Sequence, residues 1–166
     1  MTSSASNKKN EGHSSRSQRF YQAERLTSQA LIGRLFLDGS SIPAFPIRLI
    51  WLPAALTGPF PVQVLFAVPS SKFKRAVDRN RIRRQLRECW RLRKGAVYRQ
   101  LGPSPKTLAV ALLYSGRRMP TYAELGTALD VALRKLLHEL EHSHPADKPG
   151  PELGPDGVDP VLPGRD

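Results

Sequence analysis

Hydrophobic residues recur along the middle of the chain with the spacings of helices and strands, in the order α-β-β-α-β-α. The first predicted helix covers 20–38, where Leu26, Ala30 and Leu37 share one face. Gly39 follows directly and is a typical residue at which a helix ends. This pattern predicts an amphipathic helix that packs on the rest of the domain.

Three apolar stretches read as strands. Residues 46–52 and 61–68 flank a turn rich in proline and glycine, which predicts a hairpin. Residues 107–114 form a continuous apolar run, which is typical of a buried strand. A helix separates the second strand from the third, so these two are expected to lie parallel. The predicted class is α/β, an α+β sandwich with helices packed on a small central sheet.

The segment between the second and third strands reads as a basic helix with one narrow apolar stripe. Ile82, Leu86 and Cys89 follow the spacing of a helix face that packs on a core, and Trp90 lies at its edge. The last helix begins near Thr121, which has capping-box spacing from a glutamate. At about 100° per residue, the side of the basic helix opposite the stripe carries Asn80, Arg84, Arg87 and Arg91.

The two ends of the chain differ in composition from its middle. Residues 1–18 are polar and residues 143–166 are rich in proline and glycine, so both are predicted to be disordered tails. One domain is expected over 19–142. The chain has no secretory signal pattern and no apolar run of about eighteen residues. A single cysteine, Cys89, fits a cytoplasmic location.

Positive charge is concentrated in one part of the chain. Residues 72–94 hold eleven Lys or Arg against two acids and so carry +9 of the net charge of +12. Such a segment repels itself, and a polyanion is the partner it favours. A merely solvated helix face would mix charges of both signs. Attachment to a membrane surface would need a broader apolar face than this helix has.

Among polyanions, the pattern favours RNA over DNA. A helix that reads DNA bases carries a mixed set of side chains, whereas this helix is nearly all arginine, which suits contact with phosphates. Arginine can also pair with phosphate at two points and stack on bases. A strand, and not a short helix with a tight turn, precedes the basic helix.

The stretch FAVPSSKFKRAVDRNRIRRQLRECWRLRK resembles the signature of the bacterial ribonuclease P protein subunit, and the resemblance extends over roughly 20–140. Glu24-Arg25-Leu26 and Leu35-Phe36-x-x-Gly39 agree with it. The chain departs from the family at Ser70 and Ser71, where basic residues are common, and at Ile32, where an aromatic is common. The residues that carry the resemblance are Ala76-Val77, Arg79-Asn80-Arg81, Arg83-Arg84 and Arg87-Glu88.

The resemblance implies a fold and a set of RNA contacts. The basic helix would be the crossover between parallel strands, left-handed against the general rule. It would bind the catalytic ribonuclease P RNA, and a separate cleft would hold the 5′ leader of precursor tRNA. The implied RNA-binding residues are Lys72, Lys74, Arg79, Asn80, Arg81, Arg83, Arg84, Arg87 and Arg91. The implied leader-cleft residues are Ile32, Phe36, Trp51 and Phe66, of which Phe36 and Phe66 could equally be ordinary core.

No catalytic residue is predicted on the protein itself. Its carboxylates are scattered, and the histidines near the end of the last helix, His138, His142 and His144, are expected to be exposed residues and not a metal site. The predicted function is that of a ribonuclease P holoenzyme subunit, one copy per RNA, in which the RNA and its Mg²⁺ cut the phosphodiester bond. The alternative is a general RNA-binding or ribosome-associated protein.

Overall fold

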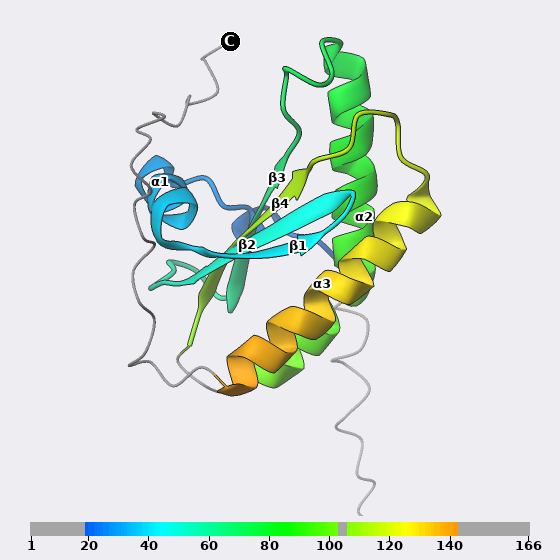
Figure 1. Ribbon diagram of the computed structural model, residues 1–166. Coiled ribbons are helices and arrows are strands. Elements are labelled where there is room, and N and C mark those ends of the chain that lie inside the picture. Colours follow the sequence, from blue (N-terminus) through cyan, green and yellow to red (C-terminus); the bar gives the residue numbers. More distant parts are fainter. Residues whose placement is uncertain (1–18, 103–105, 143–166) are drawn as a thin grey trace, which may run out of the picture.

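A four-stranded sheet separates one helix from two others in the computed structural model (Figure 1), which describes residues 19–102 and 106–142. The tails predicted for 1–18 and 143–166 lie outside the described residues. The elements in chain order are the 3-10 turn η1 (Gln22–Glu24), α1 (Gln29–Asp38), β1 (Ser40–Ala44), β2 (Ile47–Pro53), β3 (Val62–Ala67), α2 (Ala76–Leu101), β4 (Leu108–Tyr114) and α3 (Tyr122–His142).

The strand order in the sheet is β1-β2-β4-β3. The first two strands are antiparallel, as are β2 and β4, whereas β3 and β4 are parallel. The chain passes from β3 to β4 through α2, so the basic helix is the crossover between parallel strands, as predicted. The hand of this crossover stays a prediction.

The predicted hairpin between the first and second apolar stretches, 46–52 and 61–68, is wrong. Strand β4 lies between β2 and β3, and β2 instead forms a hairpin with β1, a strand that the sequence pattern missed. The register pairs Ala44 with Ile47 around the short Phe45-Pro46 turn. Strand β1 has the sequence SSIPA, whose serines and proline gave no strand signal, and an edge strand tolerates its Pro43.

The first helix begins at Gln29 and not at residue 20. The Ser28 hydroxyl caps it by accepting a hydrogen bond from the Leu31 amide at 3.3 Å. The preceding segment runs beside β3, where the Leu26 amide donates to the Val64 carbonyl at 3.1 Å. A helix through Leu26 would break that contact, and so tertiary pairing overrides the helical pattern.

The prediction that the first helix ends at Gly39 is confirmed. The reason is space, because its φ of −70° suits any residue. A Cβ at this position would collide with the Leu35 carbonyl and lie 2.8 Å from the Ile50 Cγ2. Glycine therefore lets the chain turn from α1 directly into β1 against the sheet.

The sheet buries a separate core on each face. The larger core joins the sheet to α2 and α3, and the smaller one joins it to α1 (Figure 1). Alternation along β2 sends Leu49 and Trp51 into the larger core, and Ile50 and Leu52 toward α1. The fold therefore presents two outer surfaces, one on each side of the sheet.

Candidate RNA interface

Helix α2 attaches to the larger core through the stripe that the sequence predicted. Ile82, Leu86 and Cys89 are fully buried, which confirms the predicted packing face. Trp90 is also fully buried instead of lying at the edge. Because the stripe is narrow, the rest of the circumference is left for charged side chains.

Three cations in the C-terminal half of α2, Arg91, Arg93 and Lys94, are engaged within the protein. Lys94 is 1% exposed and forms an ion pair with the fully buried Glu24. Arg93 binds Asp130 of α3 at 2.7 Å. Arg91, predicted to bind RNA, donates from Nε to Glu88 at 2.9 Å, and this contact lowers the pKa of the Glu88 carboxyl. Part of the charge that suggested a polyanion therefore stabilises the fold instead.

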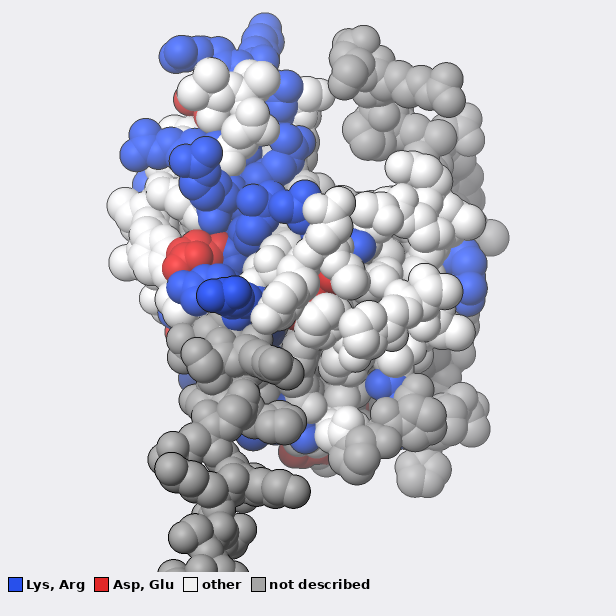
Figure 2. Space-filling view, turned by 180° about the vertical axis from the view of Figure 1, so that it is seen from behind, with Lys and Arg blue, Asp and Glu red and all other residues white. Residues whose placement is uncertain are grey.

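The N-terminal half of α2 keeps its charge toward solvent. Arg81 and Arg84 are exposed, and neither forms an ion pair with any residue that the structure describes. Arg83 is half-buried and donates to the Asn80 side-chain oxygen at 3.1 Å. Figure 2 shows Lys and Arg gathered into one band on the side of the molecule where α2 lies. This band is a surface to which a chain of phosphates can bind.

The turn before α2 is held in place by its own cations. The Arg79 guanidinium donates to the Phe73 carbonyl at 2.7 Å and to the Lys74 carbonyl at 2.9 Å. The Lys72 ammonium donates to the Ser115 carbonyl. Of the residues predicted to bind RNA, Lys72 and Arg79 thus also position the turn, while Lys74 is exposed.

Arg87 lies where two further guanidinium groups gather. Its Nε is buried and has no hydrogen-bond partner among the described residues. Burial lowers the pKa of the Arg87 guanidinium, and repulsion from Arg25 and Arg84 lowers it further. A bound anion would relieve this crowding. Sequence reasoning missed Arg25, because its position beside α2 follows from the pairing of its segment with Val64.

The four residues predicted for a leader cleft do not come together. Ile32 and Phe36 lie on α1, with Phe36 45% exposed, but Trp51 and Phe66 face the opposite core. Trp51 is 1% exposed, and its Nε1 donates to the Glu139 carboxylate at 2.9 Å. Phe66 packs edge-on against Phe20, with ring centroids 5.6 Å apart. The placement of Trp51 and Phe66 beside α1 is therefore wrong.

Other residues form the surface beside α1. The register aligns Arg48, Leu113 and Ala67 across three strands on the α1 side of the sheet. Arg48 is exposed, and Leu113 and Ala67 are partly exposed. Alternation along each strand could have indicated these positions, but only once the strand order was known.

Two of the histidines near the end of the last predicted helix lie together on α3. His138 and His142 stack with ring centroids 4.2 Å apart. No three His, Cys, Asp or Glu side chains within 19–102 and 106–142 gather as a metal site would require. In the same ranges, no helix has the length and apolar character needed to cross a membrane.

A four-stranded sheet whose crossover helix exposes arginines, of which Arg81 and Arg84 form no ion pair among the described residues, has the features of a basic α+β nucleic-acid-binding domain. Comparison with known proteins agrees, since the family model described as Ribonuclease P matches residues 20–137. The chain belongs to the ribonuclease P protein family. This membership makes it a protein subunit of an endoribonuclease holoenzyme, consistent with processing of the tRNA 5′ leader.

Individual relatives support the same family. The ribonuclease P protein component of Chlorobaculum tepidum is 34% identical over 58% of this chain and 67% of its own length. That of Porphyromonas gingivalis is 24% identical over 74% of this chain and 89% of its own. The structure of the Staphylococcus aureus RNase P protein covers 68% of this chain and 94% of that chain, with a TM-score of 0.55 and 17% identity. That structural likeness shows the shared fold.

Proposed function

We propose that α2 binds the catalytic RNA of ribonuclease P while the α1 side of the sheet receives the 5′ leader of precursor tRNA. The observation that supports the first contact is a set of cations on the N-terminal half of α2, centred on Arg81 and Arg84, which are exposed and form no ion pair with a described residue. Arg25 and Arg87 extend this set toward β3. Phosphates packed closely in folded RNA are the anions that such a band neutralises.

The leader contact rests on the surface beside α1. Phe36 offers an exposed aromatic ring, and Arg48 adds a cation on the same side of the sheet. Aromatic rings stack on bases with little sequence preference, which suits a protein that receives many different leaders. Only precursor tRNA carries a leader, so this contact would favour precursor over mature tRNA.

The chemistry in this proposal belongs to the RNA. In this proposal Mg²⁺ is held mainly by the RNA, and the cations of α2 disfavour a divalent cation beside them. By replacing part of the ion atmosphere, the protein lowers the Mg²⁺ concentration that the RNA needs. One protein copy per RNA and a cytoplasmic location complete the proposal.

The proposal is tested by cleavage of a precursor tRNA at low Mg²⁺ with the cognate catalytic RNA, in the presence and absence of the protein. We expect the protein alone to be inactive and the combination to restore 5′ cleavage. Cleavage by the protein alone would overturn the assignment of chemistry to the RNA. RNA binding without restored cleavage would favour a general RNA-binding protein.

Arg84→Ala and Arg25→Ala are each expected to weaken binding of the catalytic RNA. Each change removes one phosphate contact, so the slope of log K against log salt should fall by about one unit. Filter binding over a range of salt concentrations measures this slope. Arg134→Ala is the matched control, because Arg134 is an exposed arginine on α3. A slope for Arg25→Ala equal to that of the control would remove Arg25 from the interface.

Phe36→Ala is expected to lower the ratio of precursor to mature tRNA affinity in the assembled holoenzyme. Loss of one stacked base costs about 1–3 kcal/mol, which corresponds to roughly 5- to 150-fold in the ratio. Binding of the catalytic RNA should not change. Tyr122→Ala, which removes an exposed aromatic ring from α3 on the other side of the sheet, is the control. An unchanged ratio of precursor to mature tRNA affinity for Phe36→Ala would contradict the proposed leader contact beside α1.

A further inference from the structure

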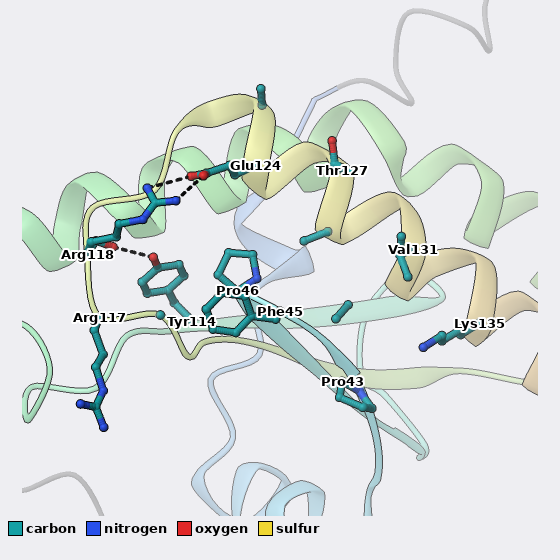
Figure 3. Close-up of a pocket in the computed structure, with 14 residues that line it drawn as sticks. Pro43, Phe45, Pro46, Tyr114, Arg117, Arg118, Glu124, Thr127, Val131 and Lys135 are labelled. Carbon is teal, nitrogen blue, oxygen red and sulfur yellow. Dashed lines mark hydrogen bonds and ion pairs between the residues drawn. The ribbon is translucent and has the colours of Figure 1, made fainter.

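A cavity of about 670 Å³ opens on the α3 side of the sheet. The β1–β2 turn, the end of β4, the loop that follows it and α3 surround this cavity (Figure 3). Its lining is mostly apolar, with cations at the edge. The lining includes Phe45, Pro46, Tyr114, Arg117, Glu124 and Lys135.

Phe45 is the most unusual side chain of this cavity. It is 82% exposed and belongs to neither core. The turn that carries it is nevertheless anchored, because the Pro46 carbonyl accepts hydrogen bonds from the Ser115 amide at 2.8 Å and from its hydroxyl at 3.0 Å. The ring is therefore presented to solvent from a fixed base, as a stacking platform requires.

Two cations at the edge remain available to a ligand. The Arg118 guanidinium is engaged by Glu124, and Arg118 together with Thr121 lowers the pKa of the Glu124 carboxyl to about 2. Arg117 and Lys135 are exposed, and no described residue forms an ion pair with either. Figure 3 shows them on opposite sides of the Phe45 turn.

The loop beside the cavity is fixed in the same way as the turn. The Tyr114 hydroxyl donates to the Arg118 carbonyl at 2.6 Å, which ties the loop to the end of β4. A Cβ at Gly116 would collide with the Tyr114 hydroxyl, so glycine is needed where the loop passes over the ring. The cation of Arg117 thus extends from a constrained loop.

The cavity adjoins the start of the basic helix. The Lys72 ammonium donates to the Ser115 carbonyl, and the Phe73 ring lies 5.7 Å from the Tyr114 ring between centroids. The cavity and α2 thus lie on the same side of the sheet, whereas α1 lies on the other. A polyanion bound along α2 can continue over Lys72 into the cavity. The 5′ leader, which is proposed to bind beside α1, would have to cross to the other side of the sheet to reach the cavity.

We infer that this cavity holds one unpaired nucleotide of the catalytic RNA. The base stacks on Phe45, and Arg117 and Lys135 contact the flanking phosphates. An exposed aromatic ring between cations is the combination with which proteins bind single-stranded nucleic acid. This inference rests on the proposed function, because the same RNA must lie along α2.

The test compares variants of Phe45 in binding of the full-length catalytic RNA by the full chain. We expect Phe45→Ala and Phe45→Leu to weaken binding about tenfold, and Phe45→Trp to retain it, because only the tryptophan still stacks. Phe45 is exposed, so the variants should keep their circular dichroism and melting temperature. Tyr122→Ala should bind like the unaltered protein. If Phe45→Leu binds the catalytic RNA as tightly as the unaltered protein does, the proposed stacking of a base on the Phe45 ring is wrong.

The cations and the source of the nucleotide are tested separately. Arg117→Ala and Lys135→Ala should each lower the salt slope by about one unit, whereas Arg134→Ala should lower it less. If Phe45→Ala weakens precursor tRNA binding by the holoenzyme but not binding of the catalytic RNA, the assignment to the catalytic RNA is wrong. If Arg84→Ala weakens binding and Phe45→Ala does not, the cavity inference fails while the proposed function stands. If the protein neither binds the RNA nor restores cleavage, the proposed function itself fails.

Discussion

Lys94→Ala is expected to lower the free energy of unfolding by about 3–5 kcal/mol, because it leaves a buried carboxylate without its cation. Lys94 and Glu24 are 1% and 0% exposed, and the Lys94 ammonium also donates to the Arg19 carbonyl. The Tyr98 hydroxyl donates to the same carboxylate. Burial and Glu24 raise the pKa of Tyr98, so this hydroxyl stays protonated at neutral pH. One hydroxyl cannot replace the lost positive charge.

Urea denaturation of the full chain measures this loss. Arg84→Ala serves as the control for removal of a cation from α2, and an exposed site should change stability by no more than about 0.5 kcal/mol. The double variant Glu24→Gln, Lys94→Met should lose less than Lys94→Ala, because it removes both charges together. Equal stability of Lys94→Ala and the control would show that Glu24 does not depend on Lys94.

Trp51→Ala is expected to cost about 3–5 kcal/mol in unfolding free energy, because it empties a large volume in the core between the sheet and α3. The ring is 1% exposed, and its Nε1 binds Glu139 of α3. Trp51→Phe keeps most of the packing but loses that hydrogen bond, so it should cost less, about 1–3 kcal/mol. Denaturation curves of both variants give these values.

The same variants distinguish a core residue from a leader contact. Measured well below its melting temperature, Trp51→Phe should keep the ratio of precursor to mature tRNA affinity, whereas Phe36→Ala should not. If Trp51→Phe lowers the ratio of precursor to mature tRNA affinity when all of the catalytic RNA is bound by protein, this result would contradict the burial of the Trp51 ring on the α3 side.

The elements with one strong apolar face could be predicted from the sequence. The stripe of Ile82, Leu86 and Cys89 identified the packing face of α2, because all three residues are buried in the core on one face of the helix. The continuous run of β4 identified a strand buried on both faces, since helices cover each side of the sheet. The Thr121 cap is also present, with the Glu124 amide donating to its hydroxyl at 3.2 Å.

The remaining parts depend on contacts between residues far apart in the chain. Strand β2 is apolar on both faces, so alternation could not tell which side Trp51 occupies. The segment around Glu24 departs from the helical pattern, and its partner Lys94 lies seventy positions away, so no local pattern could indicate this contact. The position of β4 between β2 and β3 likewise follows from pairing that no local pattern encodes.

The separation of the two cores by a single sheet has a thermodynamic consequence. The side chains proposed for the catalytic RNA project from the α2 and α3 side or from the β3 edge, and those proposed for the leader from the α1 side. The two ligands then share no contact residue, so their binding free energies add instead of competing. On the proposed function, the protein would act as a spacer that holds the leader of a precursor tRNA on the opposite side of the sheet from the catalytic RNA.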